Sequence, residues 1–211
     1  MIRMRKPLSF VLGAGLLALT TAGLCSAQEQ DQPALTPHSY RSEHFSIQIP
    51  KGWEELDRPA LDQLEAGPEG SPPEFRAQTF QHGFKETAAA AYPMILIQIE
   101  GRKRWTRNFL ASLDALPPPS NAAGSASNNF TNLRRTRFYR DQRRKMVWIR
   151  LESKRPDGTP VSDISAVYPT RSGSVQIHCT TTLASVDNYA SLCESVLTSV
   201  QVDPSVRYWP F

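Results

Sequence analysis

The strongest constraint on the fold is a pair of cysteines near the C-terminus, Cys179 and Cys193, with thirteen residues between them. Apolar and polar residues alternate along residues 174–180, which indicates a β-strand with Cys179 on its apolar side. Along residues 186–200 the apolar period becomes that of an amphipathic helix, and Cys193 lies on the apolar stripe. Both cysteines are therefore expected to point towards the core, one from a strand and one from the following helix.

The N-terminus indicates the compartment of these cysteines. Residues 1–27 begin with basic residues, continue through an apolar stretch and end at Ala27 in a small-x-Ala site, the pattern of a cleaved secretory signal peptide. A transmembrane anchor is the alternative, but glycines and threonines interrupt the apolar stretch and small residues end it. Lipid attachment at Cys25 is disfavoured because the preceding residue, Leu24, is not small. The sequence predicts an exported protein, periplasmic or extracellular, that is not an integral membrane protein after cleavage.

In an exported protein, two inward cysteines at this spacing should form a disulfide. A thioredoxin-like redox pair is disfavoured because it needs Cys-x-x-Cys. A zinc site needs more ligands than Cys179, Cys193 and the oppositely facing His178 can offer. We therefore expect a structural disulfide between Cys179 and Cys193, worth roughly 3 kcal/mol in the loop-entropy model.

Removal of the predicted signal peptide changes the charge balance. The whole chain carries 24 basic and 20 acidic residues, and residues 1–27 hold three of the basic ones and none of the acidic ones. The mature net charge is then +1 instead of +4, which is not the profile of a generic nucleic-acid-binding protein. Positive charge is concentrated in residues 102–155, with 14 basic against 3 acidic residues.

The mature chain is long enough for a single domain with a sizeable core. Residues 28–39 lack apolar periodicity and are expected to form a flexible leader, which leaves residues 40–211 as a single α/β domain. Residues 117–129 are rich in Pro, Ser, Asn and Gly and are expected to form a mobile loop.

Most of the domain has the pattern of strands. Alternating or continuous apolar runs predict strands at residues 45–50, 94–99, 145–154, 161–170 and 174–180. The run at 94–99 is almost entirely apolar, which is typical of a central strand. Helices are expected at residues 105–116 and 186–200.

Two segments of the chain resemble PsbP-like domains. The phrase Phe-x-Ile-x-Ile-Pro-x-Gly-Trp at residues 45–53 is similar to their opening strand, and strand, turn, strand and helix up to residue 203 are similar to their close. The resemblance implies an α+β fold, an antiparallel β-sheet flanked by helices in an α/β/α sandwich, here with one disulfide. It also implies an accessory or binding protein, since the family includes extrinsic subunits of photosystem II. No site residue transfers with it.

Catalytic signatures are missing from the sequence. The chain has no Gly-x-Ser-x-Gly, Ser-x-x-Lys, phosphate-loop or His-Glu-x-x-His motif, and its four histidines are scattered. The acidic residues Asp57, Asp62 and Glu65 are expected to form the hydrated face of a short helix. We therefore predict no catalytic, cofactor-binding or metal-binding residue.

The best candidate for binding is a basic segment at residues 133–155, expected to form a hairpin that turns near Asp141 and Gln142. A two-residue loop would place on one face Arg135, Arg137, Tyr139, Arg144, Met146, Trp148 and Arg150. The core would then receive Phe138, Val147, Ile149 and Leu151. Guanidinium groups beside aromatic rings suit an anionic polymer, a lipid headgroup or an acidic protein surface. The alternative is a solvated sheet face, or one whose aromatic residues a layer of helix covers.

The sequence thus favours an exported binding or accessory protein of the cell envelope. The alternative is a secreted enzyme whose catalytic residues converge only in three dimensions. The aromatic C-terminal tail, residues 206–211, is expected to pack back on the domain, with partner binding as its alternative.

Overall fold

The computed structural model describes residues 34–65, 79–89, 92–101, 106–108, 131–154 and 158–210. The expected signal peptide, the loop at 117–129 and all but residues 106–108 of the expected first helix lie outside this part of the chain.

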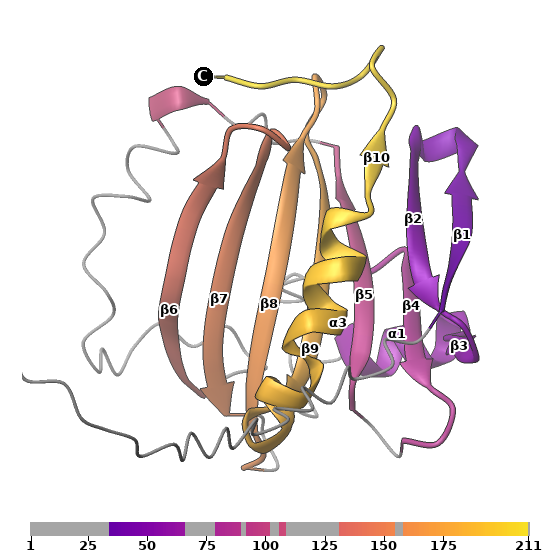
Figure 1. Cartoon of the computed structure of the whole chain (residues 1–211), viewed down its shortest axis with the longest axis vertical. Coiled ribbons are helices and arrows are strands. Elements are labelled where there is room, and N and C mark those ends of the chain that lie inside the picture. The colour runs from indigo at the N-terminus through magenta and orange to yellow at the C-terminus, as the bar shows by residue number, and fades with distance from the viewer. Residues whose placement is uncertain are drawn as a thin grey trace, which may run out of the picture. The chain divides into compact units, whose positions relative to one another are not determined.

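The largest element is a seven-stranded antiparallel sheet (Figure 1). Its strands, from one edge to the other, are β3 (Trp53–Glu55), β4 (His82–Glu86), β5 (Met94–Glu100), β9 (Ser174–Thr182), β8 (Pro160–Pro169), β7 (Met146–Lys154) and β6 (Thr131–Asp141). The apolar β5 has a strand on each side, which confirms the central position expected for it. The strands predicted from residue 145 to 180 are also confirmed.

A second sheet has three strands in the order β1 (Leu35–Tyr40), β2 (Phe45–Pro50) and β10 (Gln201–Val202). β1 pairs with β2 from Leu35 to Tyr40, although the sequence analysis assigned residues 35–39 to a flexible leader. That boundary is corrected to residue 35. The hydrogen bonds of β1 are made by its backbone, and an edge strand tolerates a proline and polar side chains, so apolar periodicity does not reveal it.

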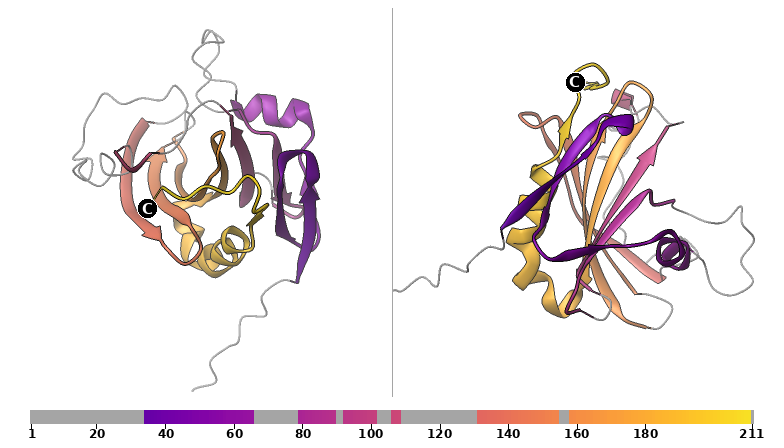
Figure 2. Two further views of the ribbon diagram at one scale, coloured as in Figure 1. Left: turned by 90° about the horizontal axis from the view of Figure 1, so that it is seen from above. Right: turned by 90° about the vertical axis from the view of Figure 1, so that its right-hand side faces the viewer.

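The two faces of the large sheet are covered by different elements (Figure 2). α3 (Val186–Thr198) and the small sheet lie over the core face, which we define as the face that carries Ile177 and Cys179. α1 (Arg58–Glu65) lies over the opposite, outer face, which carries Leu96. The main core forms between α3 and the core face because both sides are apolar.

The disulfide between Cys179 on β9 and Cys193 on α3 is confirmed. Their Cα atoms lie 5.7 Å apart, within the usual range for a disulfide, and both residues are buried. The bridge therefore ties the helix to the centre of the sheet. The fold is α+β with antiparallel sheets and one disulfide, as expected.

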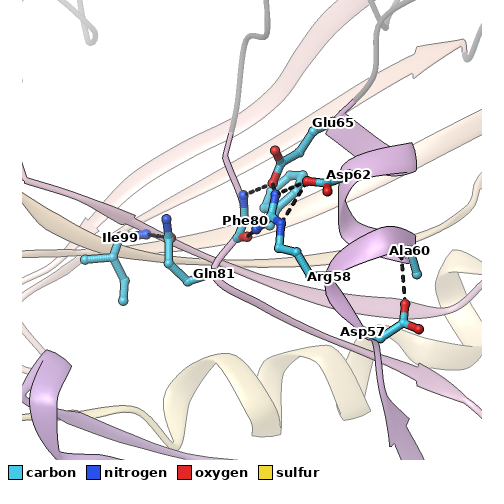
Figure 3. Close-up of polar contacts among 8 residues, drawn as sticks. All are labelled: Asp57, Arg58, Ala60, Asp62, Glu65, Phe80, Gln81 and Ile99. Atoms are coloured by element: carbon cyan, nitrogen blue, oxygen red, sulfur yellow. Dashed lines mark hydrogen bonds and ion pairs between the residues drawn. The ribbon is translucent and has the colours of Figure 1, made fainter.

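A polar cluster holds α1 on the outer face (Figure 3). The Glu65 carboxylate accepts hydrogen bonds from the backbone N–H of Phe80 at 2.6 Å and from the guanidinium group of Arg58 at 2.7 Å. Asp57 accepts from the N–H of Ala60 and caps the helix. Glu65 is only 3% exposed, which corrects the expectation that it lies on a hydrated helix face. Its burial is tolerated because it is paired.

Candidate functional site

The basic segment forms the hairpin β6–β7, with a register that differs from the expected one. Tyr139 pairs with Trp148 and Arg137 pairs with Arg150, across a four-residue turn at 142–145 instead of two residues. The difference is an even number of residues, so the same side chains still share a face of the sheet.

The orientation of that face corrects the sequence analysis. Met146 is 0% exposed and Trp148 is 6% exposed, and both belong to the main core beneath α3. The sequence analysis expected Val147 to point into the core on the opposite side of the hairpin from Trp148. Val147 instead lies on the outer face, where it packs with Val167 and Trp209. The alternative in which a helix covers the aromatic residues therefore describes the molecule. The packing of Trp209 also agrees with a C-terminal tail that folds back on the domain.

The structure changes the position of one predicted arginine and the backbone pairing of another. Arg144 lies in the turn, where its backbone N–H and its guanidinium group donate to Asp141 at 2.9 and 3.0 Å. The register shifts between Arg135 and Arg137, so that the Arg135 backbone lies opposite Leu151. The side chain of Arg135 lies outside the described part of the structure.

Four of the seven residues predicted on this face, together with residues of α3, line a pocket of about 220 Å³. The strands contribute Arg137, Tyr139, Trp148, Ile149, Arg150 and Ile164, and the helix contributes Ala190 and Glu194. Sequence reasoning did not find the helical pair. The available signal was their spacing of four residues, which places Ala190 and Glu194 on the same side of α3, beside its apolar stripe. This spacing does not indicate which face of the sheet α3 packs against.

Aromatic stacking organises the strand side of the pocket. The rings of Tyr139 and Trp148 stack with their centres 5.8 Å apart, and the guanidinium carbon of Arg137 lies 4.8 Å from the centre of the Tyr139 ring. Cation–π attraction and the stack therefore restrain the Arg137 side chain.

The two arginines on the strand side differ in their ionic partners. Arg150 donates to Ser162 at 3.2 Å and lies 3.5 Å from a carboxylate oxygen of Glu152. Arg137 is exposed and forms no ion pair with any carboxylate in the described part of the chain. Burial raises the pKa of Tyr139. The positive charge of Arg137 acts to lower this pKa, and the negative charge of Glu194 acts to raise it further. Tyr139 therefore stays a neutral hydrogen-bond donor at ordinary pH. The strand side can thus attract an anion.

A second polar cluster, missed by the sequence analysis, lies on the outer face. Nδ1 of His178 lies 3.0 Å from Ser165 Oγ and 3.1 Å from Asp163 Oδ2, and the Ser165 hydroxyl donates to Asp163 at 3.1 Å. Serine and carboxylate thus share one ring nitrogen, whereas a hydrolase triad places them on opposite nitrogens. His178 is 5% exposed and its Nε2 has no hydrogen-bond partner. The pairing of Ser165 with His178 on adjacent strands brings the cluster together.

A third polar group joins the two sheets. Nε2 of His82 lies 3.0 Å from Glu43, its Nδ1 lies 3.7 Å from Glu55, and the Tyr40 ring lies over the imidazole. Across the described residues, no set of three His, Cys, Asp or Glu side chains is placed to hold a metal ion. None of the helices in that same part of the chain is long and apolar enough to span a membrane.

The chain matches no protein-family model and no curated protein. Among solved structures it is similar to the PsbP protein CyanoP of Synechocystis sp. PCC 6803, with 16% identity, coverage of 85% of this chain and 98% of that chain, and a TM-score of 0.47. It is also similar to the Ran-binding protein Mog1p of Saccharomyces cerevisiae, with 11% identity, 83% and 100% coverage, and a TM-score of 0.47. Both likenesses concern the fold alone.

Proposed function

We propose that the protein is an exported, non-catalytic binding or accessory protein of the cell envelope, and that its pocket between the β6–β7 hairpin and α3 receives an anionic group. The observation that carries the proposal is the convergence of Arg137, Arg150 and the Tyr139–Trp148 stack on one pocket of about 220 Å³. Two guanidinium groups beside a restrained aromatic surface suit phosphate or carboxylate recognition.

Export is supported by two features. Residues 1–27 have the pattern of a signal peptide, and the Cys179–Cys193 disulfide is typical of an oxidising compartment.

The size and recess of the pocket favour one kind of occupant. The predicted broad basic face would suit an anionic polymer, but Met146 and Trp148 are buried in the core beneath α3, and the pocket lies beside them. A small anionic end group or headgroup fits such a space better than an extended polymer. Binding at exposed arginines should also weaken as salt screens their charge.

The test is titration of the purified protein with inorganic phosphate at low ionic strength, followed by amide NMR shifts. We expect shifts at Tyr139, Ala190 and neighbouring residues, and weaker binding by Arg137→Gln. The matched control is Arg171→Gln, which removes an exposed arginine from the β8–β9 turn. Absence of phosphate binding, or equal losses in both variants, would overturn the proposed site.

The enzyme alternative would use the Asp163–Ser165–His178 cluster, because Asp163 orients the imidazole and leaves Nε2 without a partner. That nitrogen is buried, however, and the serine does not lie on it. The binding role is therefore the better supported of the two.

A further inference from the structure

A row of side chains on the core face leads from the disulfide to the arginine pair. Cys179 on β9 pairs with Ile164 on β8, which pairs with Arg150 on β7. Arg150 pairs in turn with Arg137 on β6. Directly paired residues of neighbouring strands point to the same face of a sheet. The four residues therefore form one level of the sheet, with the cysteine at one end and the arginines at the other.

The disulfide fixes α3 at this level. The helix lies over β8 and β9 (Figure 1), and the bond from Cys179 to Cys193 holds the two Cα atoms 5.7 Å apart. Glu194 follows Cys193 directly, and one residue of an α-helix rises only about 1.5 Å. The backbone of Glu194 therefore lies level with Arg150 and Arg137, and its side chain lines the same pocket.

Glu194 lines the helix side of the pocket with its carboxylate unpaired. Among the residues that the structure describes, this carboxylate forms no ion pair. Ala190, about one helical turn earlier, adds only a methyl group to the same wall, which leaves space in front of the strands. A ligand can therefore lie between two guanidinium groups and one carboxylate.

The two sides of the pocket make opposite demands on a ligand. A guanidinium group only donates hydrogen bonds, whereas an ionised carboxylate only accepts them. An oxyanion without a proton satisfies Arg137 and Arg150 but meets Glu194 as a like charge, with no hydrogen bond to offer it. An oxyanion that carries a proton accepts from both arginines and donates its O–H to Glu194, and such O–H···O⁻ bonds are short and strong.

We infer that the pocket selects a phosphate that carries a proton, with its O–H donated to Glu194 and its other oxygens bound by Arg137 and Arg150. The inference rests on the proposed function of the pocket and adds the chemical class of its ligand. Inorganic phosphate keeps at least one proton near neutral pH, and a phosphate monoester keeps one only below its second pKa of about 6. Sulfate and the phosphate diesters of lipid headgroups carry none, so the pocket should discriminate against them.

The test is calorimetric titration of the purified protein at low ionic strength, at a pH above the second pKa of inorganic phosphate. Hydrogen phosphate and sulfate are then both dianions of similar size and differ by the proton. We expect phosphate to bind about tenfold more tightly, the factor expected for one hydrogen bond to a charged group. Glu194→Gln supplies an amide that can donate, so sulfate should bind more tightly and the preference should vanish.

Methyl phosphate distinguishes a free phosphate from a phosphate end group. At about pH 5 it carries a proton, because the second pKa of a phosphate monoester is about 6. An affinity at that pH comparable to that of inorganic phosphate assigns a monoester end group, and a much weaker affinity assigns the free ion.

The matched control is Asp187→Asn, which removes a negative charge from the exposed first turn of α3 and should leave the ratio of the phosphate and sulfate affinities unchanged. A simple counter-ion at Glu194 would make Glu194→Gln tighten both ions equally and keep that ratio, which would overturn the inference. Equal affinities in the unmodified protein, or a preference for sulfate, would also overturn it but leave the anion-binding pocket in place. Absence of binding by both ions would overturn the proposed function of the pocket itself.

Discussion

The aromatic rings of Tyr139 and Trp148 stack at an interplanar angle of 19° on the side of the sheet that faces α3. The same pair forms the wall of the pocket and part of the main core. Binding and stability are therefore linked at this point. Trp148 mainly supports the fold, while Arg137 and Glu194 lie at its edge and can be changed without opening the core.

Trp148→Ala should destabilise the protein strongly. Because the side chain is almost fully buried, we expect a loss of about 3–5 kcal/mol in the free energy of unfolding, measured by urea denaturation. Leu183→Ala, at an exposed apolar residue, should change it by no more than about 0.5 kcal/mol. Similar unfolding midpoints for Trp148→Ala and the unmodified protein would contradict the burial of the Trp148 side chain.

The disulfide should contribute substantially to stability. Cys193→Ser removes the link between α3 and β9, and the loop-entropy model predicts a loss of about 3 kcal/mol and a lower Tm. Mass spectrometry of the unreduced, digested protein should recover the peptides of Cys179 and Cys193 joined. The control is Cys25→Ser, which lies in the predicted signal peptide and should leave the Tm of the mature protein unchanged. Free thiols at both positions in exported material would refute the prediction.

Much of the fold was readable because apolar periodicity reports on local structure. β5 and α3 have strong patterns, and the side-chain period of two preserved the shared face of the β6–β7 hairpin despite a wrong turn length. β1 escaped detection because it contributes backbone pairing and only weak apolar alternation.

The orientation of β7 was not readable because both of its faces are apolar. Met146 and Trp148 lie on one side and Val147 and Ile149 on the other, so the pattern cannot tell which side α3 covers. The contribution of Glu194 to the pocket also depends on which side of β7 is covered by α3. The Asp163–His178 contact depends on the register of β8 and β9, which long-range pairing sets.

Glu65→Ala should loosen α1 from the outer face. The change removes a charged acceptor and leaves the N–H of Phe80 without this partner, at an expected cost of about 1–3 kcal/mol. Asp62→Ala removes the more exposed partner of Arg58 and should cost about 0–1 kcal/mol. Urea denaturation compares the two variants. Equal costs would show that the burial of Glu65 adds nothing to the attachment of α1.

Asp141 should make the hairpin turn sensitive to acid. Burial acts to raise the pKa of its carboxyl, but hydrogen bonds from the backbone and guanidinium group of Arg144 outweigh it, and the net pKa is lowered. A carboxyl with a lowered folded-state pKa stabilises the protein above its unfolded pKa of about 3.9, and this contribution is lost as the pH falls through the folded value.

Asp141→Asn should therefore lower the free energy of unfolding at pH 7 and bring it closer to that of the unmodified protein below about pH 4. Urea denaturation at several pH values measures the difference between the two proteins. Asp187→Asn, on the exposed first turn of α3, is the matched control and should not reproduce this pH dependence of the turn. A difference between Asp141→Asn and the unmodified protein that stays constant from pH 7 to pH 3 would show that the charge of Asp141 does not stabilise the turn.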